Sequence, residues 1–186
     1  MRNDITTLVL PIAGLGTRMH PLTLTTPKPF LRLGDKLLLE YMFDEAVGTS
    51  ITDVVLIANP QHREALQEFL PSIQGRYPDF TLHVCYQHEP FGDGHAVLQA
   101  ADIIRDTACI VRFSDDVIVE QESVVAGMLA RYATFQGPLI LLERVPRSDV
   151  SRYGVVAASV YEATSGIYSI QGLVEKPAVD EAPSDL

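Results

Sequence analysis

Two glycines and two cations near the N-terminus form the segment best suited to chemistry. Gly14 and Gly16 follow a short apolar run, and Thr17 and Arg18 come directly after them; Lys28 follows beyond an arm rich in proline and threonine. Glycines let a backbone approach a ligand closely, and successive N–H groups in such a turn form a concave anion site. The pattern favours a loop that binds a polyphosphate, with a plain turn carrying two solvated cations as the alternative.

The spacing of this loop excludes two common phosphate-binding motifs. A dinucleotide-binding fingerprint requires a third glycine three residues after Gly16 and a helix immediately afterwards. The chain has Met19 at that position, followed by His20 and Pro21. A Walker P-loop requires a Gly-Lys-Ser/Thr sequence, which this segment lacks.

A second loop, "YQHEPFGDGHAV", carries groups suited to a nucleobase. We expect a strand to end at Gln87, whose side-chain amide can both donate to and accept from a base edge. Gly92 and Gly94 would expose backbone groups beside it, although an ordinary strand-to-helix connection is the alternative. We interpret His95 as a helix-start or packing residue, because no partner ligand lies at metal-binding spacing.

A third loop presents two adjacent carboxylates, Asp115 and Asp116, directly after the apolar run "ACIVRF". Mg²⁺ commonly takes one or two protein carboxylates together with phosphate oxygens. The pair is therefore a candidate magnesium site, and a helix cap or turn is the competing interpretation.

Composition limits the class of protein and of partner. The 186 residues are 47% hydrophobic, which suffices for one good core, and 14 Lys and Arg face 24 Asp and Glu. The resulting formal charge of -10 argues against nucleic acid as a partner. Cys85 and Cys109 lie in apolar runs and are expected to be buried strand thiols. Without a leader sequence or a membrane-length apolar run, we expect a cytoplasmic protein that is not bound to a membrane.

Alternating elements must position these loops. Apolar or β-branched runs predict strands over residues 6–14, 53–59, 80–87, 108–116 and 138–145. Helical spacing predicts helices over residues 35–48, 60–70, 94–104 and 122–135. This alternation predicts a mostly parallel sheet covered on both faces, with functional loops at the carboxyl ends of its strands. Beyond Arg144, shorter glycine-punctuated strands indicate antiparallel hairpins and hence a mixed sheet.

Five segments, in order, carry a family resemblance: "PIAGLGTRMHPLTLTTPKP", "EPFGDGHAV", "FSDDVIV", "SRYGVV" and "GLVEKP". They resemble the bacterial UTP–glucose-1-phosphate uridylyltransferases of the sugar nucleotidyltransferase family, from about Leu8 to the last residue. The resemblance implies a Rossmann-like three-layer α/β/α fold with a mostly parallel mixed central sheet. It also implies a nucleotide-binding core over residues 1–145 and the start of a partly antiparallel sugar-phosphate-binding region over residues 146–186.

The reaction that this resemblance implies is attack of glucose 1-phosphate on the α-phosphorus of UTP, giving UDP-glucose and pyrophosphate. Arg18 and Lys28 would be the catalytic cations, and Asp115, with Asp116 as the alternative, would hold Mg²⁺. The implied nucleotide-binding residues are Ala13, Gly14, Leu15, Gly16, Thr17, Gln87, Gly92 and Gly94, with Gln87 and Gly92 reading the uracil. The implied sugar-phosphate residues are Gly154, Glu175 and Lys176.

Two departures from the family pattern qualify this expectation. Pro29 stands where the uridylyl branch usually has an acidic residue, a feature shared with guanylyl and thymidylyl relatives, so the base stays open among these. Family members also continue past "EKP" with a second metal-binding aspartate and much of the subunit interface. We therefore expect a truncated chain with little activity by itself, whose full-length form is a homo-oligomer. A non-catalytic nucleotide-binding module is the alternative.

Overall fold

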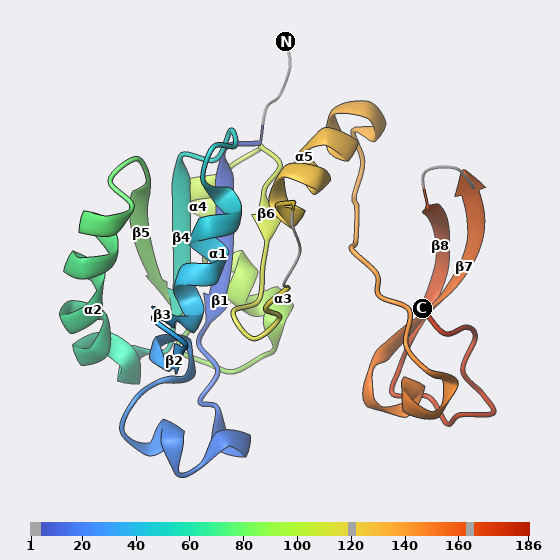
Figure 1. Cartoon of the computed structure of the whole chain (residues 1–186), viewed down its shortest axis with the longest axis horizontal. Coiled ribbons are helices and arrows are strands. Elements are labelled where there is room, and N and C mark those ends of the chain that lie inside the picture. Colours follow the sequence, from blue (N-terminus) through green and yellow to red (C-terminus); the bar gives the residue numbers. More distant parts are fainter. Residues whose placement is uncertain (1–4, 119–121, 163–165) are drawn as a thin grey trace. The chain divides into compact units, whose positions relative to one another are not determined.

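The protein divides into two compact units, Met1–Gly137 and Pro138–Leu186. Its structure, a computed structural model, describes residues 5–118, 122–162 and 166–186 (Figure 1). The first unit holds the glycine-rich loop and both aspartates, and the second holds the segment "GLVEKP".

A four-stranded parallel sheet forms the centre of the first unit, in the order β5-β4-β1-β6 (Figure 1). Its strands are β1 (Thr7–Ile12), β4 (Asp53–Ala58), β5 (Thr81–Tyr86) and β6 (Ile110–Val111). Nearly every residue of β1 and β4 is buried, as a continuous apolar run predicts for a strand covered on both faces. The described central sheet is wholly parallel, so the expected antiparallel pieces lie outside it.

Helices cover the two faces of this sheet. They are α1 (Leu38–Ala46), α2 (Arg63–Arg76), α3 (Asp93–Leu98), α4 (Ala101–Ile104) and α5 (Val124–Phe135). Leu8 and Leu10 point into the core formed with α1, α2 and α5, whereas Val9 between them joins the smaller core under α3 and α4. This alternation is the period of two that a strand imposes. None of the helices in the described ranges is long and apolar enough to cross a membrane.

Short elements complete the first unit, mainly in the long connection between β1 and α1. They are the 3₁₀ turns η1 (Thr17–Met19), η2 (Leu22–Leu24), η3 (Lys28–Phe30) and η4 (Pro60–His62), and the paired strands β2 (Arg32–Leu33) and β3 (Lys36–Leu37).

The second unit is an antiparallel hairpin with a small core of its own. After the 3₁₀ turn η5 (Arg147–Arg152), β7 (Gly154–Glu162) pairs with β8 (Ile167–Glu175). Val150, Val155 and Ala182 form the buried cluster beside the hairpin. The antiparallel hairpin expected beyond Arg144 is thus present, as a separate two-stranded sheet.

Two sequence-based expectations about elements are wrong. Residues 138–145 form no strand: Val145 donates its N–H to the carbonyl of Asp185, and Ile140 and Leu141 are exposed. A strand needs a neighbouring strand to pair its backbone, and none is present for this segment among the described residues. The expected helix over residues 94–104 is two short helices, α3 and α4.

A buried histidine, His62 of the turn η4, lies beside the end of β1. The ring of His62 hydrogen-bonds to the backbone of Ile12, and its Nδ1 atom has no partner among the described residues. Burial lowers the pKa of His62 below its ordinary value, and the hydrogen bond to Ile12 offsets only part of this effect. The folded protein therefore favours the neutral ring.

We expect the free energy of unfolding to fall as the pH is lowered below about 6.5, the ordinary histidine pKa. Because the pKa of His62 is depressed on folding, the unfolded chain binds the proton first, and protonation favours unfolding at up to about 1.4 kcal/mol per pH unit. Denaturant unfolding at several pH values should show a smaller pH dependence for His62→Gln. The same substitution at the exposed His88 is the control, and identical slopes for the two variants would contradict this assignment.

Candidate functional site

The glycine turn after β1 is held in place by the arm that follows it. Gly16 has a φ of +64°, and a Cβ atom there would lie 3.0 Å from Cγ2 of Thr23 and 3.3 Å from Cβ of Lys28. The hydroxyl of Thr23 donates a 2.8 Å hydrogen bond to the Gly16 carbonyl. Only glycine combines this backbone conformation with this close approach. At Gly14, by contrast, a Cβ atom would meet nothing within 4 Å.

Lys28 is anchored from the hydrophobic core. It begins the turn η3, in which Pro29 and Phe30 are buried. The ring of Phe30 stacks on Phe69 of α2, with centroids 4.9 Å apart and planes 10° apart. Full burial of such a ring stabilises a fold by about 1.5–3 kcal/mol, so the backbone beneath Lys28 is firmly placed.

Lys28 and Asp115 form an ion pair across the site. The Nζ atom of Lys28 lies 2.6 Å from Oδ2 of Asp115, joining residues 87 positions apart. Burial by itself would raise the pKa of Asp115, but the hydrogen bond and charge of Lys28, with the charge of Arg18, lower it below its ordinary value. Asp115 is therefore a carboxylate at neutral pH.

These residues surround a hollow of about 350 Å³, lined by Gly16, Arg18, Met19, Lys28 and Asp115. It lies beyond the carboxyl ends of β1 and β6, where open α/β sheets bind ligands. Two cations and a turn of backbone N–H groups suit a polyphosphate. The structure thus brings the glycine turn, Arg18, Lys28 and Asp115 together in one hollow.

The residues that line the hollow fit a Mg²⁺ ion that is held partly by the protein and partly by substrate phosphates. Asp115 is the one carboxylate among its lining residues, and the described residues contain no group of three or more His, Cys, Asp or Glu able to hold a metal ion. Mg²⁺ commonly binds through one or two carboxylates, with waters and substrate phosphates completing the shell. Asp116 does not line the hollow; its N–H donates to the carbonyl of Phe113.

Gln87 is buried at the end of β5 and organises the second loop. Its Nε2 atom donates to the carbonyl of Gly92 at 3.0 Å and lies 3.1 Å from Nδ1 of His95. Gly92 has a φ of +90° and precedes α3, which contains Gly94 and His95. No described residue donates a hydrogen bond to Oε1 of Gln87, which leaves this atom able to accept from a ligand.

Arg112 and Glu45 form a nearly buried ion pair beside the site, which the sequence analysis did not predict. Arg112 donates to both carboxylate oxygens of Glu45 in α1, at 3.2 and 2.7 Å, and to the carbonyl of Asp116 at 2.9 Å. Their side chains are only 10% and 12% exposed. This pair fixes the turn that carries Asp115. A single arginine inside the run "CIVRF" was the available signal, because a charge on a buried strand requires a partner.

In the second unit, the three residues assigned to the sugar phosphate lie together. Gly154 is opposite Glu175 across the hairpin, and a Cβ atom on Gly154 would lie 3.1 Å from Oε2 of Glu175. Lys176 pairs with Glu175 at 2.9 Å and donates its N–H to the carbonyl of Tyr153. Both charged side chains are exposed and able to bind a ligand.

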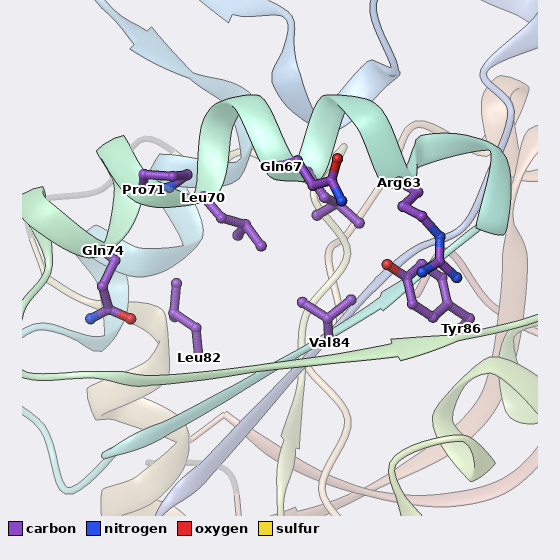
Figure 2. Close-up of a pocket in the computed structure, with 9 residues that line it drawn as sticks. Arg63, Gln67, Leu70, Pro71, Gln74, Leu82, Val84 and Tyr86 are labelled. Atoms are coloured by element: carbon purple, nitrogen blue, oxygen red, sulfur yellow. The ribbon is translucent and has the colours of Figure 1, made fainter.

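A second hollow of the first unit has a different character. It occupies about 390 Å³ between α2 and β5, and the guanidinium of Arg63 lies 4.7 Å from the ring centroid of Tyr86 at one end (Figure 2). The remaining lining residues are Leu66, Gln67, Leu70, Pro71, Gln74, Leu82 and Val84. It contains no carboxylate and none of the predicted site residues, so it is not a candidate for phosphate or metal chemistry.

Comparison with known proteins identifies the family. The family model described as "Nucleotidyl transferase" matches residues 8–185, which is almost the whole chain. This chain belongs to the nucleotidyl transferase family. Its parallel sheet, flanking helices and glycine turn are therefore those of a nucleotidyltransferase, and the family resemblance inferred from the five sequence segments is confirmed.

The similar proteins described next are all named for the same enzyme activity. This nucleotidyltransferase is 30% identical over 204 residues to the UTP–glucose-1-phosphate uridylyltransferase YngB of Bacillus subtilis, covering 100% of this chain and 68% of that protein. The UTP–glucose-1-phosphate uridylyltransferase of Streptococcus pneumoniae is also 30% identical, with coverages of 100% and 69%. A crystal structure of UDP-glucose pyrophosphorylase complexed with UDP-glucose superimposes with a TM-score of 0.88 at 30% identity, covering 97% of this chain and 72% of that one.

Replacing Gly16 should be far more damaging than replacing Gly14. Gly16→Ala forces a Cβ atom into a left-handed residue and against Thr23, so we expect it to lower the free energy of unfolding by about 1–3 kcal/mol. Gly14→Ala should change it by less than about 0.5 kcal/mol, because the added methyl group meets open space. Denaturant unfolding of the two variants makes the comparison, and equal losses would be inconsistent with the clamped turn.

Breaking the Arg112–Glu45 pair should destabilise the first unit strongly. Arg112→Met leaves Glu45 charged and nearly buried, at an expected cost of about 3–5 kcal/mol. The double variant Arg112→Met/Glu45→Leu removes both charges and should recover most of that loss. Unfolding free energies of the three proteins provide the measurement. A double variant as unstable as Arg112→Met would show that the unpaired charge is not the cause.

Proposed function

We propose that this nucleotidyltransferase makes UDP-glucose and pyrophosphate from UTP and glucose 1-phosphate, with Mg²⁺ as the cofactor, in the cytoplasm. The observation that carries the proposal is the hollow in which the glycine turn, Arg18, Lys28 and Asp115 meet. The names of the relatives support uridylyl transfer to glucose 1-phosphate as the specific reaction.

The nucleotide is assigned to the first unit. Backbone N–H groups of residues 13–17 and the charges of Arg18 and Lys28 would bind the triphosphate. Negative charge grows on the pyrophosphate as it leaves, so fixed cations beside it lower the barrier without any covalent step. Asp115 would hold Mg²⁺, which when bound offsets charge on the phosphates.

The base is assigned to Gln87. Its Nε2 atom is already engaged by Gly92 and His95, which orients Oε1 to accept a hydrogen bond. Uracil offers one ring N–H as a donor, and thymine and guanine offer a comparable group. Gln87 alone therefore does not choose among the three bases, and the uridylyl assignment is supported by the relatives rather than by this contact.

Glucose 1-phosphate is assigned to the second unit. The carboxylate of Glu175 can accept hydrogen bonds from sugar hydroxyls, and Lys176 can pair with the phosphate. Gly154 would leave room for the sugar beside Glu175. The attacking phosphate already carries its charge, so the reaction demands positioning and charge neutralisation more than a general base.

The test is nucleotide binding by the whole chain, measured as a thermal shift with UTP, dTTP, GTP, ATP and CTP, each with Mg²⁺. A nucleotide at 100 times its Kd should stabilise the folded state by about 2.7 kcal/mol. We expect UTP to give the largest shift. Lys28→Ala and Arg18→Ala should weaken UTP binding by about 10- to 100-fold, since each removes charge-assisted contacts.

Arg131→Ala removes one exposed cation of α5 and serves as the matched control. Preference for dTTP or GTP would move the assignment to thymidylyl or guanylyl transfer. Binding of UTP without pyrophosphate release in the presence of glucose 1-phosphate, even when the part of a full-length relative that this chain does not match is supplied in trans, would instead favour a nucleotide-binding module. Equal shifts for all five nucleotides, or for the control and the site variants, would overturn the proposed site.

A further inference from the structure

The two groups assigned to phosphate and to metal, the ammonium of Lys28 and the carboxylate of Asp115, bind each other. The ion pair between Lys28 and Asp115 is short, at 2.6 Å, and the side chains are 23% and 46% exposed. The pair lies in the wall of the hollow itself, beside Arg18. A ligand that takes one partner therefore leaves the other without its counterion.

Each ligand, when it binds alone, leaves a different charge of the ion pair without a partner. A triphosphate without metal can engage Lys28 only by leaving the carboxylate of Asp115 facing the phosphates, and like charges repel. A divalent cation without nucleotide can engage Asp115 only by leaving the ammonium of Lys28 facing the metal. When both ligands are present, phosphate replaces Asp115 as the partner of Lys28 and the metal replaces Lys28 as the partner of Asp115.

We propose that the Lys28–Asp115 ion pair makes nucleotide and metal binding mutually dependent, so that each ligand alone binds weakly and the two together exchange both partners of the pair. The proposal rests on the proposed function, because it takes the triphosphate and Mg²⁺ as the ligands of the hollow. Binding linkage is reciprocal, so the factor by which metal improves nucleotide affinity equals the factor by which nucleotide improves metal affinity.

This coupling predicts that removing the carboxylate of Asp115, which is proposed to bind the metal, raises the affinity of the protein for a nucleotide without metal. In Asp115→Asn, Lys28 is released and the repelling carboxylate is gone. UTP should therefore bind Asp115→Asn about three- to tenfold more tightly than wild type when EDTA removes all divalent ions. The same variant should lose most of the improvement that Mg²⁺ gives to the wild-type protein. Isothermal titration calorimetry on the whole chain measures both affinities.

The second arm follows metal directly and needs no nucleotide. Mn²⁺ serves as the probe, and the electron paramagnetic resonance signal of free Mn²⁺ reports how much is bound. Lys28→Met frees Asp115, so it should bind Mn²⁺ about three- to tenfold more tightly than wild type. Asp79→Asn removes one negative charge at an exposed position and is the control for net charge in the first arm, whereas Arg131→Met removes one exposed positive charge and is the control in the second arm.

The outcomes separate the two proposals. Failure of the wild-type chain to bind UTP with or without Mg²⁺ would overturn the proposed function. If wild type binds UTP with Mg²⁺ but Asp115→Asn in EDTA matches Asp79→Asn, the coupling is absent while the function stands. If Asp115→Asn does not fold, the Mn²⁺ affinity of Lys28→Met decides, and an affinity no higher than wild type would overturn the coupling.

Discussion

The burial of β1 on both faces and both edges is the constraint on which the rest of the structure depends. This strand pairs with β4 along its whole length and with β6 at Leu8 and Val9, and helices cover its two faces. A strand in this position cannot accept unpaired charged side chains, so charge-based chemistry is confined to its end. The chain leaves β1 at that end through the glycine turn. The parallel pairing of β1 with β6 brings the segment that carries Asp115 to the same edge of the sheet.

Charges at this edge are placed by groups that are themselves buried. Phe30, stacked on Phe69, fixes the turn that begins at Lys28. Arg112, paired with Glu45, fixes the turn that carries Asp115. The charged atoms of Lys28 and Asp115 therefore meet because two separate packing arrangements hold their backbones. A chain with a formal charge of -10 thereby keeps a local cationic site for an anion.

The second unit uses a simpler arrangement. Register in the β7–β8 hairpin places Gly154 opposite Glu175, and a small cluster around Val150 supports it. Its charged groups are exposed, unlike Arg112 and Glu45, so their interactions with each other are weak and easily exchanged for a ligand. The hairpin thus presents Glu175 and Lys176 as exposed side chains on a hydrogen-bonded backbone.

The sequence by itself determined the order of elements, the parallel core and most of the candidate site. Continuous apolar runs specify β1 and β4, and a G-x-G-T-R turn followed by a P-K pair predicts the loop that is proposed to bind phosphate, because both signals are local. The strand expected over residues 138–145 did not form, since strand formation depends on a neighbour that local sequence does not reveal.

Tertiary structure alone decided which charges face each other. Lys28 and Asp115 are 87 positions apart, and Glu45 and Arg112 are 67 apart, so no spacing rule connects them. Their pairing follows from strand order and from which face of each helix is buried. Sequence names the residue types that can bind phosphate and metal, but only the folded chain shows that Lys28 and Asp115 neutralise each other.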